Sequence, residues 1–127
     1  MARVFIAGPF DAKPRIREAA RRLEAAGYII CSNWHKEEHD DYALHEELGR
    51  REAARDITDI HSCDVFIQDT LTPSTHGSSH AEWGLSLART NRRFLVGPVV
   101  MVYHHFAYRR FWNWDEAIEW FTTPHGR

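Results

Sequence analysis

The sequence is poor in cysteine and has no excess of charge of either sign. Its 127 residues include 2 Cys, and 16 Lys and Arg stand against 18 Asp and Glu, for a net charge of −2. A chain without a basic excess lacks the electrostatic footprint of a protein that grips a polyanionic backbone. The arginine pairs at 21–22, 50–51, 92–93 and 109–110 are scattered, so we assign them to solvated faces and expect no nucleic acid polymer as partner.

Long apolar runs are also missing. No apolar stretch approaches the ~18 residues of a membrane span, and the N-terminal run is too short for the apolar part of a signal peptide. Cys31 and Cys63 each lie in or beside an apolar run that is typical of a buried strand, which favours reduced thiols over a secreted disulfide framework. We therefore expect a cytoplasmic protein with no membrane partner, folded as one domain over residues 1–127.

Short β-branched and aromatic runs alternate with helical patterns along the chain. We expect strands at 3–7, 28–32, 64–68 and 93–96, a short fifth strand within the aromatic tract 103–111 as an option, and helices at 14–26, 44–61, 79–90 and 115–121. This alternation predicts an α/β fold with a doubly wound parallel sheet of four or five strands. Ligands bind such sheets at the carboxyl ends of the strands, so the loop with Gly8, Pro9 and Phe10 and the loop 69–79 should flank the site.

The stretch 74–84, Ser-Thr-His-Gly-Ser-Ser-His-Ala-Glu-Trp-Gly, is the most informative. If Ser78 or Ser79 caps the following helix, free backbone N–H groups point into the crevice and can hold a phosphate. Glu82 would then lie in the first turn, where the helix dipole favours the ionised carboxylate that a nucleophile needs. The alternative is a capping box, Ser79-His-Ala-Glu82, in which Glu82 only satisfies a backbone N–H, and local sequence alone favours it.

Three further acidic residues are candidates, two on one helix and one at the end of a strand. Asp56 and Asp59 are three residues apart and share one face of the second helix, where a solvated surface is the default. Asp56 becomes a candidate proton donor only if that helix end points at the crevice. Asp69, at the end of the third strand, is well placed for a ligand but is equally suited to form a turn.

Three segments resemble a known family. They are 4–10, Val-Phe-Ile-Ala-Gly-Pro-Phe; 54–67, with Ala-Arg-Asp followed by Ile-His-Ser-Cys-Asp-Val-Phe-Ile; and 77–97, from Gly-Ser-Ser-His-Ala-Glu-Trp-Gly to Arg-Phe-Leu-Val-Gly. In order and spacing they are similar to the nucleoside 2-deoxyribosyltransferase-like proteins, which include deoxynucleoside 5'-monophosphate N-glycosidases. The resemblance covers most of residues 3–97 and implies a flavodoxin-like fold.

The resemblance also implies an enzymatic reaction. In a retaining double displacement Glu82 attacks C1' of a small nucleoside or nucleotide, the base departs, and water or a second base resolves the glycosyl-enzyme. Asp56 matches the aspartate that contacts or protonates the base. We expect no cofactor and no metal. Relatives in this family often complete the pocket from a neighbouring subunit, so the resemblance implies a homodimer or larger homo-oligomer.

The substrate-binding set expected from these segments and the two crevice loops is Phe5, Gly8, Pro9, Phe10, Asp69, Gly77, Ser78 and Ser79. Gly8 and Phe10 would shape the sugar and base pocket, and the two serines would meet a 5'-hydroxyl or phosphate. Many relatives carry a tyrosine at the position of Phe5, three residues before Gly8, whose hydroxyl holds the nucleophilic carboxylate. Phe5 lacks that hydroxyl, which bears on the orientation of Glu82.

Two other functions compete with this one. His35-Lys-Glu-Glu38-His39 fits the H-x-x-E-H pattern of one metalloprotease class, but the motif needs a helix, and its position between a strand and two aspartates favours a loop. The other rival is a non-catalytic nucleotide-binding or sensing module of the same fold. Transferase and hydrolase are not distinguished by the sequence.

Overall fold

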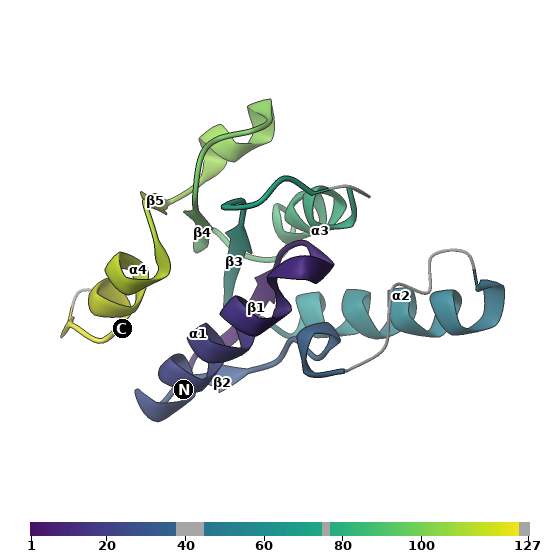
Figure 1. Ribbon diagram of the computed structural model, residues 1–127, viewed down its shortest axis with the longest axis horizontal. Coiled ribbons are helices and arrows are strands. Elements are labelled where there is room, and N and C mark those ends of the chain that lie inside the picture. The colour runs from purple at the N-terminus through teal and green to yellow at the C-terminus, as the bar shows by residue number, and fades with distance from the viewer. Residues whose placement is uncertain (38–44, 75–76, 125–127) are drawn as a thin grey trace.

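The computed structural model describes residues 1–37, 45–74 and 77–124 (Figure 1). It contains one sheet of five strands, all parallel, in the order β2-β1-β3-β4-β5. This is the doubly wound order of flavodoxin-like folds, so the predicted fold class is confirmed. The strands are β1 Arg3–Ala7, β2 Ile29–Ile30, β3 Val65–Asp69, β4 Arg93–Val96 and β5 Arg109–Phe111.

The helices form a layer on each side of the sheet. They are α1 Lys13–Ala25, α2 Glu46–His61, α3 Ser78–Ser86 and α4 Trp114–Phe121, and short 3-10 helices occur at η1 Phe10–Ala12, η2 Trp34–Lys36 and η3 Val102–Phe106. Helix α1 contacts α4, and α2 contacts α3. Figure 1 shows these two pairs on opposite sides of the strands. Because strand order reverses between β1 and β3, the crevice at their carboxyl ends lies next to α2 and α3.

The central strands are buried on both faces, as parallel sheets covered by helices require. Phe5 on β1 stacks on Phe66 on β3, with ring centroids 5.5 Å apart and an interplanar angle of 4°. Trp83 of α3 packs edge-on against Phe66 at 6.0 Å. This aromatic column joins α3 to the middle of the sheet and so fixes the helix that carries Glu82 relative to β1.

Most predicted element bounds agree with the structure. The strands at 3–7 and 93–96 are found as expected, and the fifth strand exists as β5. The second strand is only Ile29–Ile30, shorter than the predicted 28–32, because the chain turns into η2 soon after it. Helix α3 ends at Ser86, before the predicted Thr90, and the chain continues through turns such as Thr90 N to Ser86 O at 3.0 Å.

Both cysteines are buried free thiols, as the sequence indicated. Burial raises the pKa of Cys63 to about 12, which makes it a poor nucleophile. Within the described ranges no helix combines the length and apolar character needed to cross a bilayer. In that same part of the chain no three His, Cys, Asp or Glu side chains gather as a metal site would require, while Glu38 and His39 of the H-x-x-E-H pattern lie outside it.

Candidate active site

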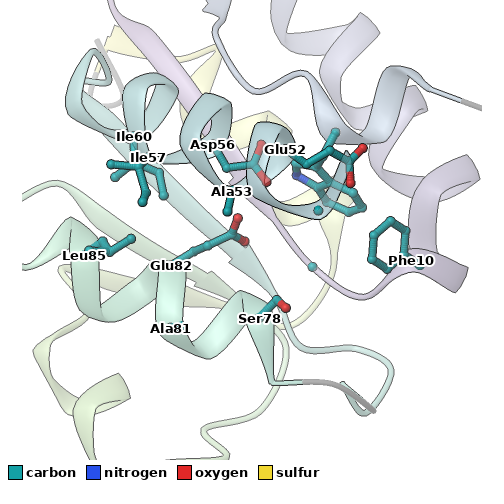
Figure 2. A pocket seen from close by; sticks show the side chains of 13 residues that line it. Phe10, Glu52, Ala53, Asp56, Ile57, Ile60, Ser78, Ala81, Glu82 and Leu85 are labelled. Carbon is teal, nitrogen blue, oxygen red and sulfur yellow. The ribbon is translucent and has the colours of Figure 1, made fainter. Parts of the chain in front are cut away.

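A cavity of about 350 Å³ opens between the loop after β1, the inner face of α2 and the start of α3. Figure 2 shows its acidic side chains on the two facing helices and Phe10 at the opposite end. The residues that line it come from four segments: Gly8, Phe10, Trp34, Gly49, Glu52, Ala53, Asp56, Ile57, Ile60, Ser78, Ala81, Glu82 and Leu85. The cavity therefore brings together five of the residues predicted from sequence, namely Gly8, Phe10, Asp56, Ser78 and Glu82.

Glu82 projects from α3 towards Asp56 on α2, and the two carboxyl groups point at one another (Figure 2). Among the described residues no hydrogen bond or ion pair forms to the Glu82 carboxyl group. Burial, and secondarily the charge of Asp56, raise the pKa of Glu82 to about 8. This pKa keeps Glu82 protonated at neutral pH, whereas the sequence predicted an ionised carboxylate stabilised by the helix dipole.

The difference has a structural cause in how α3 begins. Its N-cap is Gly77, with φ of 74°, and not Ser78 or Ser79 as expected. A left-handed residue here favours glycine. Glu82 is then beyond the first turn, where the dipole effect has largely decayed.

The capping box is also absent. Ser79 is buried inside α3, and its hydroxyl accepts a hydrogen bond from Gln68 Nε2 at 3.1 Å. No side chain caps α3 in the structure. The alternative in which Glu82 merely satisfies the N-cap N–H is therefore wrong, and the side chain is left to face the cavity.

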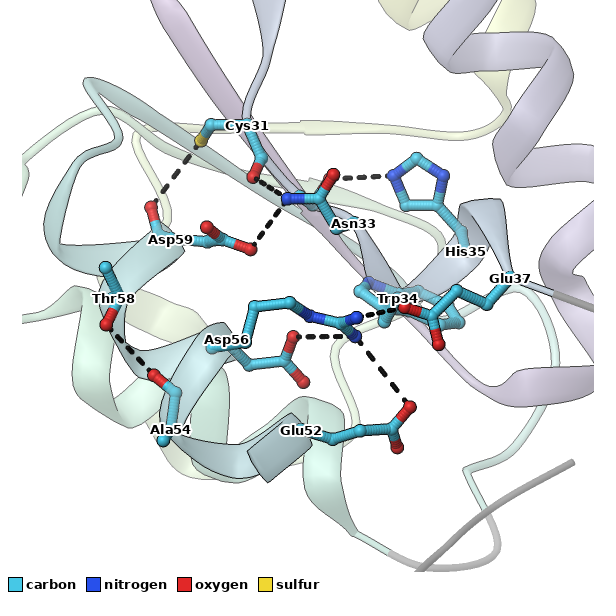
Figure 3. A network of polar contacts seen from close by, with 12 residues as sticks. Cys31, Asn33, Trp34, His35, Glu37, Glu52, Ala54, Asp56, Thr58 and Asp59 are labelled. Carbon is cyan, nitrogen blue, oxygen red and sulfur yellow. Dashed lines mark hydrogen bonds and ion pairs between the residues drawn. The ribbon is translucent and has the colours of Figure 1, made fainter. Parts of the chain in front are cut away.

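Asp56 lies among charges of both signs (Figure 3). Arg55 Nη2 is 3.7 Å from Asp56 Oδ1 and 3.8 Å from Glu52 Oε1, and Arg55 Nη1 bonds to Glu37. Burial nevertheless raises the pKa of Asp56 to about 6, with Arg55 opposing the shift and the neighbouring carboxylates adding to it. Asp56 Oδ1 is buried without a hydrogen-bond partner, and the Asp56 side chain lines the cavity, where it could accept or donate a proton.

Asp59, paired with Asp56 in the sequence prediction, is used differently. Its Oδ2 accepts a hydrogen bond from Asn33 Nδ2 at 3.1 Å, and its backbone oxygen accepts one from the Cys31 thiol at 3.5 Å (Figure 3). Asp59 does not line the cavity. Of the two aspartates on this helix face, only Asp56 is positioned to meet a ligand.

Aromatic side chains form the wall opposite α3. Phe10 meets Trp34 edge-on at 5.8 Å, and Trp34 Nε1 donates to Ile6 O at 2.7 Å, which anchors the indole at the end of β1. Flat aromatic surface suits a planar base. Gly8 packs closely beneath this wall, so that a Cβ there would lie 2.6 Å from Ile16 Cδ1 and would force that side chain to shift.

The remaining predicted residues lie outside the cavity wall. Phe5 is fully buried in the core, and Pro9 is buried at the start of η1, where its oxygen accepts from Ala12 N at 3.0 Å. Asp69 accepts both arms of the Arg15 guanidinium at 2.8 and 2.9 Å, and Trp114 Nε1 at 2.8 Å. These bonds occupy the Asp69 carboxylate in a structural ion pair.

A second cavity of about 350 Å³ lies on the other side of the start of α3, lined in part by Gln68, Asp69, Ser79 and His80. Gln68 Oε1 accepts from His104 Nε2 at 2.6 Å, and Gln68 Nε2 meets His80 Nδ1 at 2.9 Å. Burial lowers the pKa of His104 to about 4, so its ring is neutral. This chain of bonds ties the first turn of α3 to β3.

Trp34 and Glu52 are the aromatic and the acidic side chain among the cavity residues that were not predicted from the sequence. The signal for Trp34 was an aromatic directly after the carboxyl end of the second strand, where doubly wound folds bind ligands. Glu52 could have been found by its spacing of one helical turn before Asp56. Neither could be separated from ordinary core and surface residues without the packing of α2 on α3.

Two of the solved structures that match this architecture are an N-glycosidase and a deoxyribosyltransferase. The CMP N-glycosidase BcmB of Clostridium botulinum matches with a TM-score of 0.59 at 20% identity, over 92% of this chain and 95% of that one. A 2-deoxyribosyltransferase of Bacillus psychrosaccharolyticus matches with a TM-score of 0.72 at 16% identity, over 92% of this chain and 90% of that one. No protein-family model and no curated protein matches the chain.

At these identities the likeness defines the class of fold, a flavodoxin-like α/β domain. The two neighbours are an N-glycosidase and a deoxyribosyltransferase, which matches the nucleoside 2-deoxyribosyltransferase-like family that the three sequence segments resemble.

Proposed function

We propose that this protein is an enzyme that cleaves or exchanges the N-glycosidic bond of a (deoxy)nucleoside or its 5'-monophosphate, with Glu82 as the nucleophile and Asp56 as the proton donor. The observation that carries the proposal is the Glu82 carboxyl group, unpaired in a cavity at the carboxyl edge of the sheet and facing Asp56. The activities named for the two structural neighbours, CMP N-glycosidase and 2-deoxyribosyltransferase, are of the same type.

The reaction has two displacements at C1'. In the first, a Glu82 carboxylate oxygen forms a bond to C1' as the C1'–N bond breaks; its electron pair leaves with the base, and the Asp56 proton neutralises a ring nitrogen. In the second, water or the nitrogen of another base attacks C1', the ester bond to Glu82 breaks, and the proton of the attacking group passes to Asp56. Both steps proceed through an oxocarbenium-like transition state.

The pair carries the proton that this scheme needs. With pKa values of about 6 for Asp56 and about 8 for Glu82, the two groups hold one proton between them over the neutral range. Because Glu82 has the higher pKa, it is the group that holds that proton. Reaction requires the tautomer with the proton on Asp56 and the charge on Glu82, which differs only by transfer between facing carboxyl groups.

Phe5 fits this scheme with one adjustment. Its buried ring cannot donate a hydrogen bond to Glu82, and the carboxyl group has no other hydrogen-bond donor among the described residues. Orientation of the nucleophile would then rest on Asp56 and on the bound sugar. Ser78, at the start of α3 on the cavity wall, is the group that would meet a 5'-hydroxyl or phosphate.

The second candidate function is a nucleotide sensor without turnover, which the Phe5 substitution favours. Incubation with deoxynucleosides and their monophosphates, with and without a second free base, separates the cases. Release of free base identifies a hydrolase, a new nucleoside identifies a transferase, and binding without product identifies the sensor. Glu82→Ala should abolish turnover, whereas Glu47→Ala, at an exposed salt bridge with Arg51 on α2, should leave it intact.

We also propose that the protein acts as a homo-oligomer in the cytoplasm. Several large apolar side chains are exposed between β4 and α4, a density that favours an interface. They are Val100, Val102, Tyr103, Phe106, Tyr108 and Trp112, the last 75% exposed. The free thiols of Cys31 and Cys63 suit a reducing compartment. Analytical ultracentrifugation across micromolar concentrations tests the assembly, and a monomer throughout would contradict it.

A further inference from the structure

The polar side chains on the cavity wall are almost all carboxyl groups. Glu52, Asp56 and Glu82 supply them, Ser78 adds one hydroxyl, and the described lining includes no Lys or Arg side chain. The Trp34 N–H is already donated to Ile6 O. The polar groups that a ligand meets here are therefore carboxyl groups, which only accept hydrogen bonds when ionised and can also donate one when protonated.

Glu52 and Asp56 form a matched pair on α2. They are separated by four residues, which places their Cβ atoms about 5–6 Å apart on one helix face. Both side chains face the cavity (Figure 2). Arg55 lies within 3.8 Å of Glu52 and 3.7 Å of Asp56, and offsets part of their negative charge (Figure 3).

The two carboxyl groups differ in what they can offer. Asp56 has a pKa of about 6, well above that of an ordinary aspartate, so it carries a proton readily when a ligand adds to its burial. Glu52 forms an ion pair with Arg55, and a carboxylate has about four lone-pair sites, so it can accept a further bond while that pair persists. Side by side, α2 presents one O–H donor and one acceptor.

We propose that Glu52 and Asp56 together read the amidine edge of a nucleobase, the ring nitrogen next to an exocyclic amino group, so that the site prefers cytosine and adenine to uracil, thymine and hypoxanthine. The inference rests on the proposed function and names Glu52 as its specificity residue. The amino group donates to Glu52, and the ring nitrogen accepts from Asp56. In an oxo base the carbonyl oxygen faces the Glu52 carboxylate and the ring N–H faces the Asp56 hydroxyl, so both contacts become repulsive.

The same contact assists the chemistry. A hydrogen bond from Asp56 to the ring nitrogen becomes proton transfer as the C1'–N bond breaks, and the base leaves as a neutral molecule. The Glu52 bond to the amino group holds the base in the register that this transfer needs. Glu52 and Asp56, one turn apart on α2, would thus serve both to recognise the base and to activate it as a leaving group.

The test compares nucleosides of equal shape. The wild-type protein should show a kcat/KM at least about tenfold higher for deoxycytidine than for deoxyuridine, and for deoxyadenosine than for deoxyinosine, because mispaired buried polar groups discriminate strongly. Glu52→Gln replaces one acceptor oxygen by a donor at constant shape and should bring both ratios to within about threefold. Glu47→Gln, in an exposed pair on the same helix, should leave both ratios unchanged.

A binding measurement separates this inference from the proposed function. In Glu82→Ala, calorimetry should find cytosine bound more tightly than uracil and adenine more tightly than hypoxanthine, and adding Glu52→Gln should remove the difference. Turnover without an amino preference, or with a preference that Glu52→Gln does not change, overturns the inference and leaves the proposed function standing. If no nucleoside is cleaved, the proposed function fails, and the base-binding ratios alone then decide the inference: a preference for amino bases supports it, and equal or absent binding overturns it.

Discussion

The activity of the site should depend on pH through the proton shared by Asp56 and Glu82. The reaction needs one proton on the pair, because the doubly protonated form has no nucleophile and the doubly ionised form has no acid. With pKa values of about 6 and about 8, kcat/KM should be greatest near pH 7. It should be about tenfold lower at pH 5 and at pH 9, since each limb falls about tenfold per pH unit.

Two variants show which residue causes the fall in kcat/KM at low pH and which causes the fall at high pH. Asp56→Asn removes the acid and also the negative charge that raises the pKa of Glu82. This variant should be less active than the wild type. Its kcat/KM should rise with pH until Glu82 is ionised, at a lower pKa than in the wild type, and should then stay constant, without the fall at high pH. Glu82→Gln should show neither limb, because neither the nucleophile nor the coupled proton remains.

The assay is release of free base from a deoxynucleoside, followed by chromatography in buffers of constant ionic strength from pH 5 to 9.5. A control with Arg51→Gln, which alters an exposed salt bridge on α2, should reproduce the wild-type profile. A wild-type profile that is flat over this range would refute the reasoning. So would a high-pH limb that persists in Asp56→Asn, because the acid would then be another group.

Three further outcomes follow from the structure. Because the pKa of Glu82 is raised in the folded state, that state holds more protons than the unfolded chain and loses stability as pH rises from about 4.5 through about 8. Glu82→Gln should relieve roughly 4 to 5 kcal/mol at pH 8.5 and about 1 kcal/mol or less at pH 5, measured by urea unfolding at both pH values. Gly8→Ala should reduce the free energy of unfolding by about 1 kcal/mol or more, because the new Cβ meets Ile16 Cδ1 at 2.6 Å, and an unchanged urea midpoint would contradict this packing. Asp69→Asn should lower the free energy of unfolding by about 2 to 3 kcal/mol, because it leaves Arg15 without its buried partner, while the folded variant keeps the wild-type KM; a large KM change would instead place Asp69 in the substrate site.

Much of the fold could be predicted because local signals and global architecture agree. The run at β1 is short, apolar and closed by Gly8 and Pro9, and β4 is an equally short apolar run, so their bounds follow from composition alone. The N-cap of α3 was predicted wrongly because serine and glycine are both favoured at helix N-caps. Only the backbone conformation at Gly77 shows which residue is the N-cap.

The site was predicted in part. Glu82 and Asp56, both candidates from the sequence, line one cavity, yet their ionisation depends on burial and mutual distance, which no local pattern contains. Asp69 sits where the switch-point rule expects a ligand contact, but a partner from distant α1, Arg15, occupies it. Trp34 reaches the cavity only because the chain turns at η2 and anchors the indole on β1. These are long-range contacts, and they determine which of several equivalent residues faces the ligand.

The most direct test of the nucleophile is to trap the glycosyl-enzyme. A 2'-fluoro-arabinosyl nucleoside should slow the second displacement more than departure of the base, because the fluorine destabilises the oxocarbenium-like transition state and a good leaving base sustains the first step. After quenching, peptide mass spectrometry should find the fluorosugar on Glu82, with no adduct in Glu82→Gln. Turnover with the sugar attached to another residue, or with no adduct under conditions where base is released in a burst, would contradict the assignment of Glu82.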